Sequence, residues 1–440
     1  LFVAHPESIL AVWIEIPLAL LVGWKLLRGG SMLIWGGLAL IVMYLCIGIG
    51  SLESVRPLLA FEWGDSPLGE TLKENSRLFW LFVLFIYAWI ASSMPVQKLL
   101  QPRDAINSHQ LFAAIGAPLV GMVVATVSGS SDLEIVAPAI NQSLPAEAPP
   151  LFPFLFITIA CGAISGFHCM VASGTTSKQL ESESHARSIG YGAMILEGGL
   201  AVIVILCCVS AAGFADQAAW TAKYSSNWVG SDSLIVRLDG FIYGGARFIQ
   251  EVVPFPAIEF LASVVTVVII SFAATTMDSA TRIQRYVLEE LGRSSGLRVL
   301  ENRHVAAATA VISAGALALL AGEGGTGGLV LWPIFGVTNQ LLASLTLVVL
   351  TTWQSRRGRP VLPTLIPLVA LTFIVGWAAT VKMAELLSGD SIPWHQVGVL
   401  GLGIFLQAWM LTEGLLALKG KESLHGSVNE LGVVQRVGKD

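Results

Sequence analysis

"IGYGAMILEGGLAVIVILCCVSA" (Ile189–Ala211) is an apolar run with a single charged side chain, Glu197. At a rise of about 1.5 Å per residue, a helix of this length crosses a hydrocarbon core about 30 Å thick. A charge at the centre of such a helix costs on the order of 2.5–3.5 kcal/mol, so it needs a partner or a function. The stretch predicts a transmembrane helix and makes Glu197 a candidate site residue.

The rest of the chain repeats this pattern. Of the 440 residues, 54% are hydrophobic and 12% are charged, about half the charged fraction of a soluble protein. The net charge of −5 says little about partners because the distribution of charge matters more, and no segment is basic enough for nucleic acid. The five cysteines lie in apolar runs and are interpreted as small buried residues. The apolar runs are 9–27, 32–52, 78–96, 111–129, 151–173, 189–211, 256–277, 305–321, 329–352, 363–383 and 396–418. We therefore predict an all-α polytopic membrane protein with a transmembrane domain over 1–418 and a tail over 419–440.

The Lys and Arg residues indicate how the spans are oriented. Alternate connections, together with the tail, carry 18 of the 25 basic residues, and the arginine-rich segments 282–303 and 355–360 belong to this set. The positive-inside rule places these connections and the C-terminus in the cytoplasm, and the N-terminus outside. The long connection 212–255 is amphipathic, so we expect an interfacial or re-entrant segment there.

Polar side chains gather at the end of one span, in "GFHCMVASGTTSK" (Gly166–Lys178). Helical spacing places them on one polar face about two turns long. This face either caps the helix and bonds a neighbour, or lines a transport pathway. In a pathway, the hydroxyls of Ser173, Thr175 and Thr176 suit a sodium ion. A proton would instead use His168 together with Glu197.

Two other spans contain helix-breaking or buried amide residues. Pro95 follows Ser92 and Ser93, whose hydroxyls can satisfy the carbonyl groups that proline leaves unpaired. Asn339 and Gln340 lie in "LWPIFGVTNQLLAS" (Leu331–Ser344). A simple kink explains such breaks, but interrupted helices with polar side chains also form the binding sites of secondary transporters.

Charged residues beside the spans are candidates for a cytoplasmic gate. They are Arg103, Asp104, Lys178, Asp278 and Arg282. Asp278 and Arg282 are four residues apart, so on a helix they pair, either as a latch during transport or as an ordinary exposed ion pair. Glu15, near the outer end of the first span, is expected to reach water.

Five segments carry a resemblance to a known family. They are "LLQPRDAINS" (Leu99–Ser108), "GFHCMVASGTTSKQ" (Gly166–Gln179), "ARSIGYGAMILE" (Ala186–Glu197), "TTMDSATRIQRY" (Thr275–Tyr286) and "LWPIFGVTNQLLA" (Leu331–Ala343). In this order they resemble the carbon starvation protein A (CstA) family. The chain departs from the commoner family pattern at Ala172, where a serine is frequent.

The resemblance implies a transporter of the bacterial inner membrane with an inverted-repeat fold like that of the amino acid–polyamine–organocation superfamily. The implied substrates are peptides or pyruvate during carbon starvation, with a coupled proton or cation and no cofactor. Because residue 1 is Leu and the family's N-terminal portion has no counterpart here, we expect about four spans to precede it.

Three other classes are weighed against a transporter. An ion channel would be built around a symmetric filter rather than scattered helix breaks. A membrane-embedded hydrolase would use Ser165 or Ser173 with His168, but no third orienting group is evident. A purely structural membrane protein would not need Glu197 or interrupted spans.

Overall fold

The computed structural model describes residues 1–63, 66–142, 150–224, 231–255, 257–320, 323–389 and 392–419. The described chain is helical, with one isolated β-bridge between Ile135 and Ser210. Eleven of its helical segments are long and apolar enough to cross a membrane, and each overlaps one of the predicted spans. The prediction of an all-helical membrane protein with eleven spans is therefore confirmed for this part of the chain.

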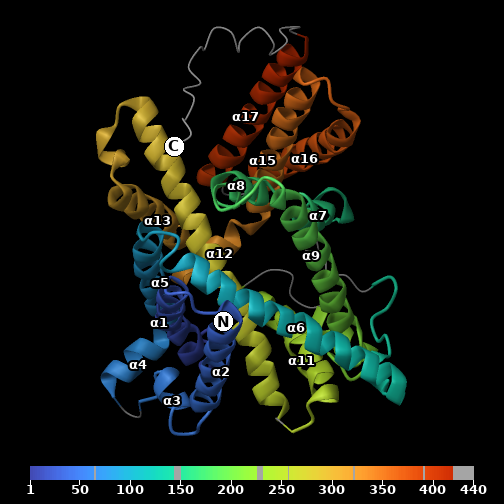
Figure 1. Cartoon of the computed structure of the whole chain (residues 1–440). Helices are drawn as coiled ribbons and strands as arrows, with labels where there is room; N and C mark the ends of the chain where they lie inside the picture. Colours follow the sequence, from blue (N-terminus) through green and yellow to red (C-terminus); the bar gives the residue numbers. More distant parts are fainter. Residues whose placement is uncertain are drawn as a thin grey trace. The chain divides into compact units, whose positions relative to one another are not determined.

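Figure 1 labels most of the helices along the chain. Their bounds are α1 Ser8–Leu26, α2 Met32–Gly50, α3 Arg56–Leu59, α4 Pro67–Glu74, α5 Ser76–Ser93, α6 Leu100–Ser128, α7 Phe156–Ala163, α8 Gly166–Gly174, α9 His185–Val209, α10 Gln217–Tyr224, α11 Ser231–Val252, α12 Ile258–Ser295, α13 Arg303–Leu320, α14 Gly327–Val330, α15 Trp332–Arg356, α16 Leu362–Ser388 and α17 Trp394–Lys419. Residues 420–440 of the predicted tail lie outside the described residues.

Two helices are much longer than the predicted spans. The prediction began a span at 111, whereas α6 begins at Leu100, and it ended a span at 277, whereas α12 continues to Ser295. The helices extend beyond the apolar runs because helical structure continues through polar and charged residues. Some of these side chains, among them Arg103, Asp278 and Arg282, are buried between helices. α12 stops instead at Gly296, whose φ of +75° is the left-handed conformation that favours glycine at a helix end.

The chain divides into two compact units. The first contains Leu1–Ala148 and Gln179–Leu329, and the second contains Pro149–Lys178 and Val330–Asp440. In the first unit, α1 packs on α2 and α6, and α12 packs on α5, α6, α11 and α13. Its largest apolar cluster includes Met43, Ile47, Ile106 and Val267, which are buried at the contacts of α1, α2, α6 and α12.

The second unit is built on α15, which packs against α7, α8, α16 and α17. Its apolar cluster includes Ile157, Leu341, Val375 and Leu400, one from each of four helices. The predicted span 151–173 is interrupted inside this unit. Ile164 and Ser165 leave the helical conformation between α7 and α8, with ψ values of 93° and 134°.

The predicted interfacial connection contains a long packed helix. α11 contacts α6, α9 and α12, and its side chains Ile242, Ala246 and Phe248 are fully buried. It carries Asp239, Arg247 and Glu251 among its apolar residues, and it is not one of the eleven helices apolar enough to cross a membrane. The amphipathic character predicted from the sequence therefore corresponds to one packed face and one outer face.

Candidate functional site

Four side chains from four helices of the first unit form one buried polar network. Arg103 of α6 is its centre: its Nε donates to Glu15 Oε1 of α1 at 3.0 Å, and its Nη1 donates to Asp278 Oδ2 of α12 at 2.7 Å. The hydroxyl of Tyr87 from α5 lies 2.7 Å from Arg103 Nη1 and donates to Asp278 Oδ2 at 2.7 Å. The network therefore ties α1, α5, α6 and α12 together.

The network is shielded from solvent. The side chains of Glu15 and Asp278 have no exposed surface, and that of Arg103 is 1% exposed. Each carboxylate bonds Arg103 through one oxygen, while the other oxygen, Glu15 Oε2 or Asp278 Oδ1, is buried and makes no hydrogen bond of good geometry with the described residues. Two carboxylates thus share one guanidinium, which leaves one negative charge uncompensated within these ion pairs.

The network lies inside the length of a spanning helix. Glu15 is seven residues from the start of α1 and eleven from its end, or about 10 Å and about 16 Å along the axis. Asn107 of α6 and Ser271 of α12 are close enough to the Glu15 carboxyl to interact with it. Both amide atoms of Asn107 and the hydroxyl of Ser271 are buried without a hydrogen-bond partner of ideal geometry. The Glu15 carboxyl is therefore shielded from solvent and also surrounded by polar side chains.

The predicted pairing of Asp278 with Arg282 is wrong. Asp278 pairs with Arg103, and Arg282 donates to the carbonyl oxygens of Ala91 and Met94, both at 2.8 Å. Arg282 is 1% exposed, so an exposed ion pair is excluded as well. Its guanidinium instead satisfies carbonyl groups at the end of α5, where a cation is also favoured by the helix dipole.

The segment around Pro95 ends a helix rather than kinking one. α5 stops at Ser93, Met94 is extended, and α6 begins at Leu100. The hydroxyls of Ser92 and Ser93 both donate to the carbonyl oxygen of Trp89, at 3.2 and 2.8 Å. Trp89 lies six residues before Pro95, and the carbonyl oxygen of Ala91, four residues before Pro95, accepts from Arg282 instead. The serines therefore do not bond the carbonyl group that this proline leaves unpaired.

A second buried polar cluster lies in the second unit, at the interruption between α7 and α8. The side chain of Asn339 from α15 accepts from the backbone N–H of Phe167 at 2.8 Å and donates to Ser165 Oγ at 3.1 Å. Its Nδ2 is also 3.2 Å from Cys161 Sγ. Asn339 therefore satisfies backbone and side-chain groups that the broken helix leaves unpaired, as an N-cap does. Gln340 donates to the Ile157 carbonyl at 3.4 Å.

The backbone of α8 approaches α15 very closely at Gly166. A Cβ added there would collide with the carbonyl oxygen of Asn339 and lie 2.6 Å from Leu342 Cβ. Only glycine fits at this contact, which holds Phe167 N–H against the Asn339 amide. We call Ser165, Gly166, Phe167 and Asn339 the amide clasp.

The other residues predicted for the pathway lie outside both clusters. The hydroxyls of Ser173 and Thr175 donate to carbonyl groups of their own helix, at Cys169 and Val171, both at 3.0 Å. Thr175 is buried, whereas His168, Ser173 and Thr176 are exposed. The structure describes no group of three His, Cys, Asp or Glu side chains that would hold a metal ion.

Glu197 of α9 is exposed, and so are the gate candidates Asp104 and Lys178. Glycines 198 and 199 beside Glu197 have open space around them. Of the five gate candidates, Arg103 and Asp278 contact each other, and Arg282 is buried separately against carbonyl groups at the end of α5. Sodium binding at Ser173, Thr175 and Thr176, and proton binding at His168 and Glu197, stay predictions.

Sequence reasoning missed two members of the network. Glu15 was expected to reach water, and this was wrong because its side chain is fully buried and paired with Arg103. Tyr87 carried no functional assignment. The available signal was its hydroxyl within an apolar span, since a buried tyrosine usually finds a hydrogen-bond partner.

Both buried clusters include residues of the motifs that suggested a family. Comparison with known families gives a match to the one described as carbon starvation protein CstA, over residues 1–378. The chain belongs to this family. Arg103 and Asp278 lie in two of the five motifs, and Gly166 and Asn339 lie in two others.

Three curated relatives illustrate the similarity. The chain is 29% identical to the peptide transporter CstA of Helicobacter pylori, over 94% of the chain and 65% of the relative. It is 31% identical to the peptide transporter CstA of Mycobacterium tuberculosis, over 84% of the chain and 54% of the relative. It is 27% identical to the pyruvate/proton symporter BtsT of Escherichia coli, over 86% of the chain and 60% of the relative.

These alignments cover between 54% and 65% of the relatives' length. No solved structure gives a significant match to the chain. The CstA-family relatives are transporters rather than enzymes. The protein is therefore a multi-pass membrane member of a bacterial transporter family.

Proposed function

We propose that the protein acts in secondary active transport of small peptides or pyruvate across the bacterial inner membrane, driven by protons. The observation that carries this proposal is the buried network of Glu15, Arg103 and Asp278. Two carboxylates that share one guanidinium can accept a proton on an oxygen that does not bond Arg103. Because the site is closed, no charged group becomes exposed to lipid when this happens. A proton taken up there weakens one ion pair of Arg103.

That change of pairing is the coupling step we propose. Arg103 links α6 to α1 through Glu15 and to α12 through Asp278. Protonation of either carboxyl removes one of these links, which shifts the balance between two arrangements of the helices. The name of the pyruvate/proton symporter among the relatives supports the choice of the proton. The names of the peptide transporters support peptides as substrates.

The inverted-repeat architecture implied by the family resemblance is part of the same proposal. It rests on the family resemblance, and the interruption between α7 and α8 is a feature that transporters of that kind also have. The cytoplasmic C-terminus, inferred from the basic connections, also belongs to the proposal.

Uptake measured with the full-length protein in membrane vesicles tests the function. With an inwardly directed proton gradient, labelled pyruvate or a labelled dipeptide should accumulate above its external concentration, and a protonophore should abolish the accumulation. Counterflow of the same substrate should persist without a gradient. Equilibration without accumulation under every ion gradient would identify a channel and contradict the proposal.

A further inference from the structure

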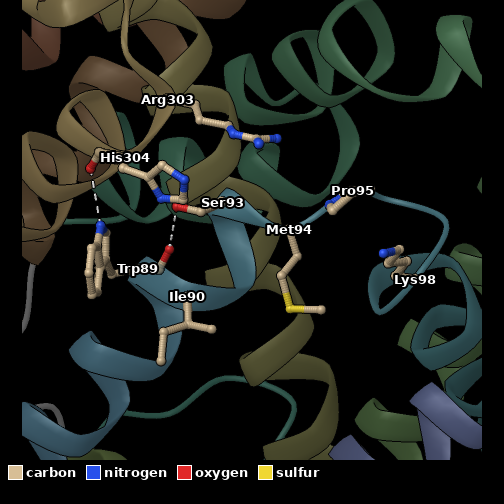
Figure 2. A pocket seen from close by; sticks show the side chains of 8 residues that line it. All are labelled: Trp89, Ile90, Ser93, Met94, Pro95, Lys98, Arg303 and His304. Atoms are coloured by element: carbon tan, nitrogen blue, oxygen red, sulfur yellow. Dashed lines mark hydrogen bonds between the residues drawn. The ribbon is translucent and has the colours of Figure 1, made fainter.

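A pocket of about 390 Å³ lies in the first unit, where the end of α5 meets the start of α13 (Figure 2). Its basic side chains are Lys98, Arg303 and His304. No acidic side chain is among the described residues that line it. The buried network uses none of these residues.

The two permanent cations of this pocket are available to a ligand. Lys98 and Arg303 are exposed, and neither side chain has an ion pair or hydrogen bond with the described part of the chain. Arg303 is the first residue of α13, so the positive end of an 18-residue helix adds to their charge. The pocket therefore attracts an anion.

The pocket also has an apolar part. Trp89, Ile90 and Met94 form it, and Trp89 Nε1 donates to the His304 carbonyl oxygen at 3.1 Å (Figure 2). This bond fixes α5 to α13 beside the pocket. A ligand that fills the site must have an apolar part next to its negative charge.

An exposed apolar stripe on α5 continues from this apolar part. Phe82, Ile86 and Ile90 are 53%, 59% and 50% exposed. Their spacing of four residues places them on one helix face, over about 12 Å. Since α5 is one of the eleven helices suited to cross a membrane, this stripe is suited to contact acyl chains.

We propose that the pocket binds the phosphate headgroup of an anionic phospholipid, whose acyl chains lie along Phe82, Ile86 and Ile90. Basic pockets between spanning helices recognise such headgroups. A free anion would contact only the basic side chains and would make no contact with the apolar stripe. This inference concerns a separate site and does not depend on the proposed transport.

Titration of the purified full-length protein, in an uncharged detergent, with dioctanoyl phosphatidylglycerol tests the site. Intrinsic tryptophan fluorescence and thermal stability report binding, and dioctanoyl phosphatidylcholine and inorganic phosphate are the comparison ligands. Each cation removed should lower the affinity for phosphatidylglycerol about fivefold. The double variant Lys98→Ala/Arg303→Ala should therefore bind about 25-fold more weakly. The double variant Arg187→Ala/Arg298→Ala, which loses two other exposed cations, should bind normally.

A second variant separates the two sources of phosphate. Ile86→Asn should weaken phosphatidylglycerol binding and leave any binding of inorganic phosphate unchanged. Equal losses in the two double variants, or no saturable binding of phosphatidylglycerol, would overturn the site. If inorganic phosphate binds the pocket as tightly as phosphatidylglycerol does, the pocket's ligand is not a lipid.

Discussion

The two units satisfy their buried polar groups in different ways. In the first unit Glu15, Arg103 and Asp278 bring formal charges together, whereas in the second unit Asn339 meets backbone and hydroxyl groups that carry none. A charged network changes its pairing when a proton arrives, but an amide clasp has nothing to titrate near neutral pH. The proposed response to protons therefore belongs to the first unit, and the second unit holds a helix break that does not titrate.

The largest effect is expected when the centre of the charged network is removed. Arg103→Met would leave two buried carboxylates without a cation. It should cost about 3–5 kcal/mol of stability and abolish transport. Thermal unfolding in detergent, followed by tryptophan fluorescence, measures the loss. The control is Arg298→Met, which removes an exposed arginine. Equal stability of the two variants would show that the network is not closed to water.

A somewhat smaller effect is expected at the close approach in the clasp. Gly166→Ala places a Cβ against the Asn339 carbonyl oxygen, which cannot move without shifting α15. We expect a loss of about 3 kcal/mol, at the upper end of overpacking effects. Gly162→Ala on the neighbouring α7, where a Cβ meets open space, should be neutral or slightly stabilising. The two variants are compared by thermal unfolding in detergent. Equal stability of both would show that α8 does not approach α15 closely at Gly166.

Removing the clasp's amide should cost less than removing the network's cation. Asn339→Leu keeps the volume but leaves Phe167 N–H and Ser165 without their partner. The expected loss is about 2 kcal/mol of stability. The dependence of uptake on the proton gradient should not change in this variant. A shift in that dependence would mean that the second unit also takes part in coupling, and the contrast between the units would be lost.

The smallest effect is expected at the hydroxyl groups of α8. Thr175→Val removes a bond to the Val171 carbonyl that the helix does not need, so stability should change by less than about 0.5 kcal/mol. Uptake measured with and without sodium decides its other role. Loss of a sodium dependence in this variant would favour the sequence-based sodium site, and an unchanged response would favour the network.

The sequence predicted the number of spans because length and apolar composition alone determine it. It also singled out Asn339 and Gln340 as buried amides in an interrupted span, and Arg103 and Asp278 as candidates for a cytoplasmic gate. It did not reveal their partners, because pairing across helices depends on packing. The residues Glu15 and Arg103 are far apart in the chain, and only the contact of α1 with α6 joins them.

Local spacing was also misleading at two positions. Asp278 and Arg282 have the spacing of a helical ion pair, but both side chains turn to groups on other helices. The interruption at Ile164 and Ser165 contains no proline, so no local signal marked it. It is stabilised by Asn339, which comes from a distant segment. A helix break at a proline can be predicted from the sequence. A break that is stabilised by a side chain from a distant segment cannot.

The most direct test of the account is to remove the negative charge of the network without changing its shape. Asp278→Asn and Glu15→Gln, in the full-length protein in membrane vesicles, should each lose proton-driven accumulation of substrate while counterflow continues. Glu290→Gln, which changes an exposed acid of α12 outside the network, should behave as the unmodified protein does. Full proton-driven accumulation in both network variants would contradict the assignment of coupling to the first unit.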